Sequence, residues 1–328
     1  MNLAIVSDFN IAGELTSLWR AINKYTKHKA RCIIAYDDSF QYDRDIILNN
    51  DQAKKEAAGW CNNADFFYFG RTIFNWPGID FNKLLNKNNC CVKYYGSELR
   101  GGYEKIKKFH EITGLPAVTG TDWTITGRLT DSFYHLESYF TKFGDMVEAD
   151  IPRAKPVEDG RLKIQAGSAG SPIKGYEFFN QAVQELKQEG VPIDLEFLME
   201  LSNKECLERK LNYNCTFTSV NGGWGLSGIE GFFLGHIVLS CLDPWVMGLY
   251  PSNPTVIIDK QKLKQVLKGL AENVDFLSGV YGDAGRKFAI ENFSTKKMLK
   301  QHLYLFDLIM HREEYMAGGK SVEEIYQF

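Results

Sequence analysis

The sequence predicts an α/β protein built from two doubly wound parallel sheets. Short apolar runs that read as buried strands alternate with amphipathic helical patterns in the first half of the chain, and the alternation starts again in the second half. Between the two series, Ile151–Gly160 holds two prolines and charges of both signs, which is typical of a linker. Because strands that alternate with helices favour parallel β–α–β units, we expect two similar lobes.

The first half of the chain carries the strand patterns of the first lobe, which we expect to span residues 1–150. Strands are predicted at 3–6, 31–36, 65–69, 90–95 and 116–119, and helices at 15–25, 52–59 and 103–113. The stretch Asp37–Asn50 is polar and rich in turn residues. Gly96 is expected to turn the chain after its strand, and Ser97 to cap the next helix.

The second half repeats this pattern over the predicted second lobe, residues 161–294. Strands are predicted at 162–166, 194–199, 215–219 and 236–241, and helices at 174–188, 202–209, 226–234, 261–273 and 275–292. Ser171 is a natural N-cap and Pro172 suits a first helical position, so Lys174 is expected within the first turn of its helix. The last part, 295–328, is predicted as an amphipathic helix over 295–311 and a loosely held polar tail.

Composition and charge narrow the class of protein. The chain has 328 residues, of which 44% are hydrophobic and 24% charged, as in ordinary globular proteins. A net charge of −3 gives no general attraction to nucleic acid or anionic lipid. The N-terminus lacks the pattern of a signal peptide, and no apolar run approaches the length of a membrane span. The seven cysteines show no ligand-like spacing, so we expect buried thiols and a cytoplasmic protein.

The stretch Val220–Asp243 is the strongest candidate for a binding site. It opens with the loop Gly222-Gly223-Trp224-Gly225 and continues into a short apolar helix that carries one acid, Glu230. A glycine-rich turn before a helix leaves backbone N–H groups free to bind an anion, and the helix dipole adds positive potential. One carboxylate on that helix could bind the hydroxyls of a sugar. The alternative is a loop, helix and strand from the core of any α/β protein.

A second candidate stretch is Leu162–Tyr176, where a strand ends in Gly167 and Ser168 and leads to Lys174. A cation in the first turn of a helix is disfavoured by the helix dipole unless an anion lies between them. Lys174 is therefore a candidate anion ligand, and the alternative is a solvated lysine. In the loop after the first strand, Gly13 is placed where an amide could meet a phosphate. The sequence contains no dinucleotide fingerprint, no Walker motif, no metal-spaced cluster and no nucleophile elbow.

Together these stretches resemble the GT-B glycosyltransferases, in particular the large retaining family four, also called glycosyl transferases group 1 or glycogen-synthase-like. The segments Gly223–Leu226 and Glu230–Val238 stand where that family has acid–Gly–aromatic–Gly–Leu and Glu-Ala-Met-Ala-x-Gly-x-Pro-Val. Lys174-Gly175 matches the Lys-Gly that opens the first helix of the second domain, and Gly96–Arg100 matches part of a His-Gly-Ser-Glu-x-Arg motif. The sequence departs from the family at several positions: Gly222 for the first glutamate, Tyr95 for histidine, Ser168 near the usual arginine, His236 for a basic residue, and Ile237 for proline.

The resemblance implies a GT-B fold with two Rossmann-like domains, an acceptor domain and a donor domain, around a central cleft, and a late helix that crosses back to the first domain. It implies roles in catalysis for Lys174, Glu230 and Glu98. The implied donor-binding residues are Gly13, Gly167, Ser168, Lys174, Gly223, Trp224, Gly225, Leu226 and Glu230. Tyr95, Ser97, Arg100 and Asp122 are implied at the acceptor or the cleft, and Arg128 or Arg100 could supply the missing second cation.

The expected function is transfer of a sugar from a nucleoside-diphosphate sugar, a UDP-sugar first among them, to an acceptor hydroxyl, with retention and without a metal or cofactor. The acceptor stays open among a glycan, a lipid-linked sugar and a modified nucleic-acid base of a viral system; a peripheral membrane contact also stays open. The chain shows no basic nucleic-acid signature. Two other functions remain as alternatives, a GT-B sugar-nucleotide epimerase and a degenerate, non-catalytic sugar-nucleotide-binding module.

Overall fold

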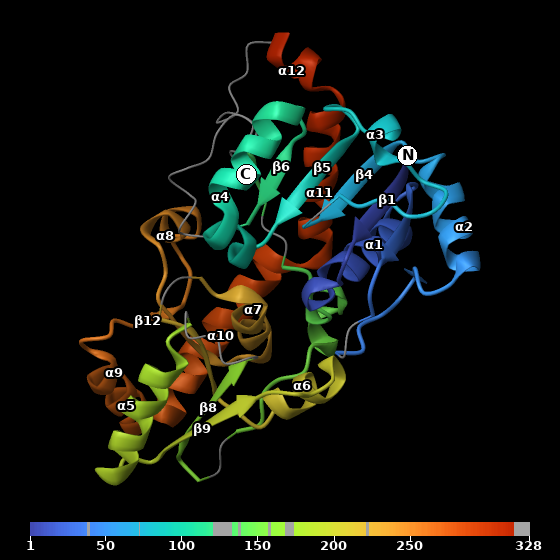
Figure 1. The fold of residues 1–328 in the computed structure, drawn as a ribbon. Helices are drawn as coiled ribbons and strands as arrows, with labels where there is room; N and C mark the ends of the chain where they lie inside the picture. Colours follow the sequence, from blue (N-terminus) through green and yellow to red (C-terminus); the bar gives the residue numbers. More distant parts are fainter. Residues whose placement is uncertain are drawn as a thin grey trace.

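A computed structural model describes residues 1–37, 40–71, 73–120, 133–136, 139–156, 159–167, 174–220 and 223–317. It shows two α/β lobes, each around a parallel sheet, and confirms the predicted fold class (Figure 1). The segment 151–156 runs from the first lobe toward the second sheet, which begins at Leu162. The exact domain boundaries stay a prediction. Within these described ranges, no helix is long and apolar enough to span a bilayer.

The first sheet has the strand order β3-β2-β1-β4-β5-β6-β7, with all neighbours parallel. In such a sheet, the order reverses between β1 and β4, and ligands bind beyond the carboxyl ends of the strands at that point. The loop after β1, which contains Gly13, lies there. The strands are β1 (Asn2–Ser7), β2 (Lys29–Ile34), β3 (Ile46–Ile47), β4 (Phe66–Gly70), β5 (Cys90–Tyr94), β6 (Ala117–Thr119) and β7 (Phe133–His135).

The second sheet has the order β12-β11-β10-β8-β9, again all parallel. Its order reverses between β8 and β10, so this lobe has its own predicted ligand position beyond the ends of those two strands. The strands are β8 (Leu162–Gly167), β9 (Ile193–Leu198), β10 (Cys215–Ser219), β11 (Ile237–Ser240) and β12 (Val256–Ile257).

Amphipathic helices cover both sheets. Helix α1, for example, buries Leu15, Leu18 and Ile22 against the first sheet. The helices that precede the linker are α1 (Glu14–Tyr25), α2 (Asp51–Cys61), α3 (Phe81–Leu84) and α4 (Gly96–Thr113). Those that follow it are α5 (Tyr176–Gln188), α6 (Asn203–Lys210), α7 (Gly225–Leu234), α8 (Pro244–Leu249), α9 (Leu263–Glu272), α10 (Val274–Phe293), α11 (Thr295–Met310) and α12 (Arg312–Ala317).

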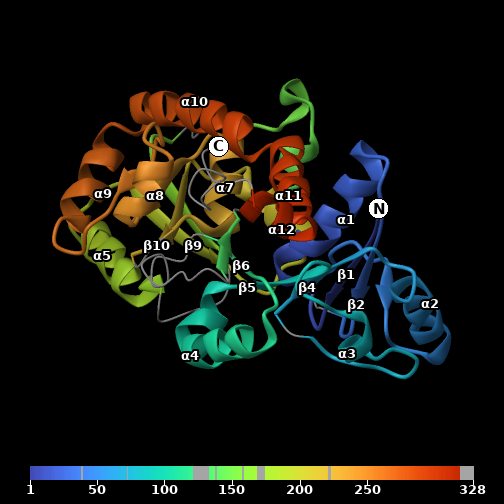
Figure 2. The ribbon, with the colours of Figure 1, turned by 90° about the horizontal axis from the view of Figure 1, so that it is seen from above.

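Helix α11 comes late in the chain but packs against the first sheet. The ring of Phe306 lies 4.8 Å from that of Phe66 and 5.6 Å from that of Tyr68, both on β4. His302 is fully buried on the same helix. The view from above shows α10 lying across the second lobe and α11 beside α1 (Figure 2). The two lobes are thus tied together by the end of the chain as well as by the linker.

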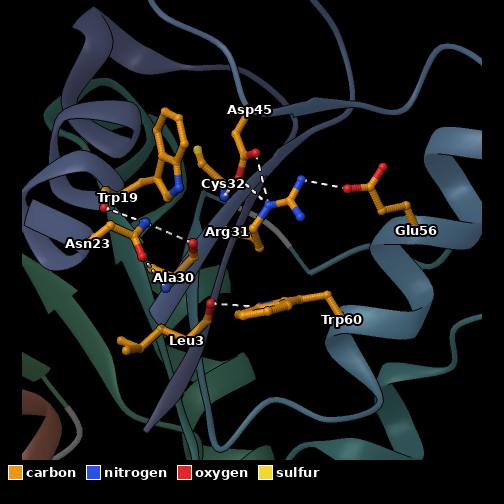
Figure 3. A network of polar contacts seen from close by, with 9 residues as sticks. All are labelled: Leu3, Trp19, Asn23, Ala30, Arg31, Cys32, Asp45, Glu56 and Trp60. Atoms are coloured by element: carbon orange, nitrogen blue, oxygen red, sulfur yellow. Dashed lines mark hydrogen bonds and ion pairs between the residues drawn. The ribbon is translucent and has the colours of Figure 1, made fainter. Parts of the chain in front are cut away.

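A network of polar contacts holds the outer edge of the first sheet (Figure 3). The Arg31 guanidinium donates to both oxygens of Asp45 at 2.9 Å and to Glu56 of α2 at 2.7 Å. Asp45 also accepts from the backbone N–H of Cys32, and the indole of Trp60 donates to the carbonyl of Leu3 at 2.9 Å. These bonds fix the loop before β3 and the helix α2 to the strands β1 and β2.

The predicted elements are present, with differences at short elements and at helix starts. The two-residue strands β3 and β12 and the short α3, α8 and β7 carry too few residues for a periodic pattern, so the sequence did not predict them. Helix α4 starts at Gly96 rather than at 103. Helix α5 starts at Tyr176, so the prediction that Lys174 lies in its first turn is wrong. Gly175 has φ +72°, which ends any helical path into α5 from residues before it.

Candidate functional site

Helix α7 forms the core of the candidate site in the second lobe. Ile229, Phe232 and Phe233 are buried, and Gly235 ends the helix with φ +79°. Two glycines let the helix approach β10 closely: a Cβ at Gly231 would lie 2.6 Å from Oγ1 of Thr216, and one at Gly228 would lie 2.9 Å from a methyl carbon of Thr218. The helix is therefore pressed onto the end of β10, and its N-terminus points to the switch point of the sheet.

Glu230, the single acid of α7, forms a buried ion pair with Lys210. The Nζ of Lys210 lies 2.5 Å from Oε2 of Glu230 and 3.2 Å from Oγ of Ser227, one turn earlier on α7. Their side chains are only 2% and 7% exposed. Lys210 is the last residue of α6. No sequence pattern points to its role, since the helix NKECLERK is otherwise a charged surface helix.

Polar groups of β8, of β10 and of the residue before β11 surround this pair. The amide of Gln165 donates to Oγ1 of Thr216 at 2.8 Å and lies 3.4 Å from Oγ of Ser227. Nδ1 of His236 lies 2.7 Å from Oγ1 of the same threonine. Burial, with the nearby Lys210 charge, lowers the pKa of His236 to about 3, so the ring is neutral at pH 7. One cation and one anion thus share an otherwise uncharged polar cluster.

A cavity of about 830 Å³ brings residues of both lobes together. This volume is in the range of small-molecule sites. From the second lobe, Leu226 and Glu230 of α7 and Asn203 and Lys204 of α6 line it. The backbone N–H of Asn203 donates to the carbonyl of Phe40, which links α6 to the first lobe beside the cavity. Helices α6 and α7 lie on the side of the second lobe that faces the first (Figure 1).

Gly13 lines the same cavity from the first lobe. Its φ is +72°, and a Cβ there would lie 2.5 Å from Cδ1 of Tyr42, another lining residue. Only glycine therefore fits between the loop after β1 and the tyrosine ring. The glycine caps α1, so the N-terminus of a helix opens toward the cavity from this lobe as well.

The charged side chains of the cavity wall favour an anionic ligand. Two of the lining cations are already paired, Arg20 with Asp43 and Lys24 with Asp145, the latter at 2.8 Å. Glu230 is neutralised by Lys210. Among the described residues, the remaining lining cations are Lys142 and Lys204, and the Nζ of Lys204 lies 3.9 Å from the exposed Glu208.

Lys174 lies beside the site but does not line this cavity. Its carbonyl accepts from the N–H of Val220, which precedes the loop into α7, and its Nζ lies 5.9 Å from the ring centre of Tyr176. The Tyr176 hydroxyl in turn donates to the carbonyl of Gly167 at the end of β8. Residues 167, 174 and 220 therefore meet at the carboxyl edge of the second sheet, where the sheet order reverses. The anion-binding role of Lys174 stays a prediction.

The side chain of Trp224 does not fit its predicted role in donor binding. Its indole is 1% exposed and packs among Phe232, Tyr250, Phe288 and Phe293, with ring centres 5.5 to 6.0 Å away. Its Nε1 donates to Thr255. The indole is a core side chain and cannot contact a donor, so only the backbone of Trp224 is left for that role. Gly223 and Gly225, both with positive φ, flank it.

The motif Gly96–Arg100, with Tyr95 before it, lies only partly within the described residues. Tyr95 is half-buried, and the Nζ of Lys93 lies 6.0 Å from its ring centre. The backbone of Ser97, Glu98 and Arg100 belongs to the first turns of α4, which begins at Gly96 as the strand ends. The side chains of Ser97, Glu98 and Arg100, together with Ser168, Gly222, Asp122 and Arg128, lie outside the described residues.

No protein-family model matches the chain, and no curated protein is similar to it in sequence. Solved structures are similar in three dimensions. The catalytic domain of starch synthase IV from Arabidopsis thaliana, bound to ADP and acarbose, aligns with a TM-score of 0.62 at 11% identity, over 95% of this chain and 99% of that one. Anabaena Alr3699/HepE in complex with UDP and glucose aligns with a TM-score of 0.60 at 11% identity, over 94% and 99%.

An α-glucosyltransferase in complex with UDP and a 13-mer DNA containing an HMU base aligns with a TM-score of 0.58 at 12% identity, over 94% of this chain and 99% of that one. At such identities the likeness concerns the fold. It extends over nearly the whole length of each protein, and so includes both lobes and their connection. With two parallel α/β lobes and a cavity between them, the chain has the GT-B fold that its sequence motifs resemble.

Proposed function

We propose that the chain is a glycosyltransferase that moves a sugar from a nucleoside-diphosphate sugar to an acceptor hydroxyl, with retention and without a metal. The observation that carries the proposal is the shared cavity. Gly13 of the first lobe and Leu226 and Glu230 of the second line one space of about 830 Å³ beside the N-terminus of α7. Both lobes therefore offer the groups that a nucleotide sugar needs at a single place.

In this mechanism α7 holds the donor. Its first N–H groups, from Leu226 onward, and the helix dipole would stabilise the diphosphate, whose charge grows as the bond to the sugar breaks. Glu230 would accept hydrogen bonds from the ribose hydroxyls. Lys174, at the carboxyl edge of the same sheet, would reach the departing diphosphate when the lobes close. Closure would also exclude water from the donor, which favours transfer over hydrolysis.

A uridine donor is the first choice. Of the three similar structures named above, two hold UDP and one holds ADP. The binding of both nucleotides is therefore to be compared. Acceptors among these proteins differ, and for this chain a glycan, a lipid-linked sugar and a modified base stay open. A cytoplasmic setting is also part of the proposal; all seven cysteines are unpaired thiols, which suits a reducing compartment.

The proposal is tested by titration calorimetry with UDP, ADP and GDP, and by release of UDP from UDP-glucose. Wild-type protein should bind UDP and turn over the donor, and turnover should persist in EDTA. Glu230→Gln and Lys174→Met should each reduce turnover by roughly 100-fold, because each removes a charged contact to the donor. The matched controls are the exposed Glu272→Gln and Lys268→Met on α9, which should leave turnover unchanged.

The outcomes separate the alternatives. Binding of none of the three nucleotides contradicts the proposal. Binding of UDP without turnover or transfer indicates the non-catalytic binding module. Conversion of the donor sugar to an epimer in the absence of acceptor indicates the epimerase. Loss of turnover in EDTA would contradict the metal-independent mechanism.

A further inference from the structure

Lys210 is an unusual residue for the interior of a protein. It is 2% exposed, whereas lysines are almost never fully buried unless they are paired. Within the part of the chain that the structure describes, its ammonium has two partners, Oε2 of Glu230 at 2.5 Å and Oγ of Ser227 at 3.2 Å. Both partners lie on α7, so the end of α6 is fixed to the helix that carries the candidate donor site.

The surroundings leave Glu230 as the counterion of this lysine. Gln165 from β8 is uncharged, and its amide donates to Oγ1 of Thr216 from β10 and to Oγ of Ser227, which are uncharged as well. His236 faces the cluster from the segment before β11 as a neutral ring. Cys206, one turn before Lys210 on α6, stays a neutral thiol, because burial raises its pKa. The cluster therefore contains one positive and one negative charge.

The two partners are not equivalent with respect to the cavity. Glu230 lines it, whereas Lys210 lies behind the carboxylate and does not. A buried ion pair is commonly no more stable than a well-packed apolar pair of the same volume. Stability alone therefore gives little reason to keep a charged pair here. A carboxylate held at a cavity wall, with one oxygen fixed by a lysine behind it, is suited to accept hydrogen bonds from a ligand with its other oxygen.

We propose that Lys210 is a positioning residue for the nucleotide: it fixes the carboxylate of Glu230 for the ribose hydroxyls and cancels its charge so that the diphosphate can bind at the start of α7. This inference rests on the proposed function. Glu230 lies within two turns of the N-terminus of α7. An unpaired carboxylate there would reduce the positive potential at the N-terminus of α7. It would also repel the diphosphate, because the surroundings have a low dielectric constant. With Lys210 in place, the wall is neutral and the N-terminus keeps its attraction for anions.

The experiment compares the binding of UDP, uridine and 2′-deoxy-UDP by calorimetry. Wild-type protein should prefer UDP over 2′-deoxy-UDP by about 10-fold or more, the strength of one hydrogen bond to a charged acceptor. Lys210→Met leaves Glu230 as an unpaired anion, so affinity for UDP should fall by about 100-fold while affinity for uridine changes much less. Lys210→Arg keeps the charge and should recover most of the UDP affinity.

The double variant Lys210→Met with Glu230→Gln carries the test further, because it has no unpaired buried charge and should fold even where Lys210→Met does not. It should bind UDP more tightly than Lys210→Met does and should no longer distinguish UDP from 2′-deoxy-UDP. An exposed lysine that does not line the cavity, Lys268 on α9, provides the control, because Lys268→Met should leave the UDP affinity and the ribose preference unchanged.

Two results would overturn the inference alone. One is a Lys210→Met protein that binds UDP as wild type does. The other is an equal loss of UDP and uridine affinity with the preference for UDP over 2′-deoxy-UDP unchanged, which would show that the lysine has only a structural role. By contrast, a wild-type protein that binds no nucleoside diphosphate would overturn the proposed function and this inference together.

Discussion

Two charged clusters lie beside the two sheets, and they differ in how far their cations are removed from water. In the first lobe, Arg31 is 29% exposed and divides its bonds between Asp45 and the half-exposed Glu56. In the second, Lys210 is 2% exposed and its carboxylate partner, Glu230, lines the cavity. The first cluster joins a loop and a helix to the edge of a sheet. The second places the carboxylate of Glu230 at the cavity wall, where a ligand can reach it. Lys210 lies behind that carboxylate and away from water, so water cannot take its place when Lys210 is mutated.

The largest difference between the clusters should appear when the cation is removed. Lys210→Met leaves a buried carboxylate unpaired, and the free energy of unfolding should fall by about 3–5 kcal/mol. Arg31→Met leaves carboxylates that water can solvate, and the loss should be about 1 kcal/mol. Urea unfolding followed by circular dichroism measures both. Equal losses would mean that the pair in the second lobe is not buried as described.

The helices that carry the two acids can be compared through their glycines. Gly231 of α7 has no room for a Cβ because Thr216 lies 2.6 Å away, so Gly231→Ala should lower the free energy of unfolding by about 1–3 kcal/mol. Gly59 of α2, the helix of Glu56, has open space around the same position. Gly59→Ala should stabilise the protein by about 0.5–1 kcal/mol. Thermal unfolding of both variants checks the signs; a stabilising Gly231→Ala would rule out the close contact of α7 with β10.

A further difference concerns the dependence of stability on pH, which involves a buried histidine in each lobe. Burial lowers the pKa of His236 and of His302 to about 3, against about 6.5 in the unfolded chain. The unfolded chain therefore binds more protons, and stability falls as the pH decreases from about 6.5 toward 3. Each histidine contributes up to about 1.4 kcal/mol per pH unit in this range.

Urea unfolding at pH 7, 6 and 5 measures this slope, and His236→Gln and His302→Gln should each reduce it. Arg31 itself should add nothing to the slope in this range, since its bonds to Asp45 and Glu56 raise the pKa of the guanidinium further above neutrality. An unchanged slope in both glutamine variants would show that folding does not lower the pKa of either ring.

The fold could be predicted largely from the sequence because its strands are strongly apolar. The alternation of patterns in each half predicted both parallel sheets, and the sheet edge at Gly13 followed from the position of a loop after a buried strand. Glu230 stood out because it is the one charge in an apolar helix after a glycine-rich loop. Short elements such as β3 and β12 could not be predicted, since two residues form a strand only when a neighbouring strand pairs with them.

The site could be predicted only where its residues are close in sequence. Lys210 was missed because nothing local distinguishes it from the solvated charges of α6; its direction is set by the packing of α6 beside α7. Trp224 was misread for the opposite reason. Its glycine neighbours suggested a ligand contact, but its aromatic partners Phe288 and Phe293 come from α10, far along the chain. The helical pattern predicts Lys174 inside α5, whereas the residue precedes the helix. The sequence pattern does not reveal that Gly175 takes a left-handed conformation.

The packing of α11 on the first sheet has a consequence for synthesis. During translation β4 leaves the ribosome long before residues 295–310, so Phe66 and Tyr68 must wait for Phe306 to cover them. Until then one apolar side of the newly made first lobe stays open to chaperones or to other nascent chains. The first lobe can therefore be completed only after residues 295–310 have been made, although its strands are made first.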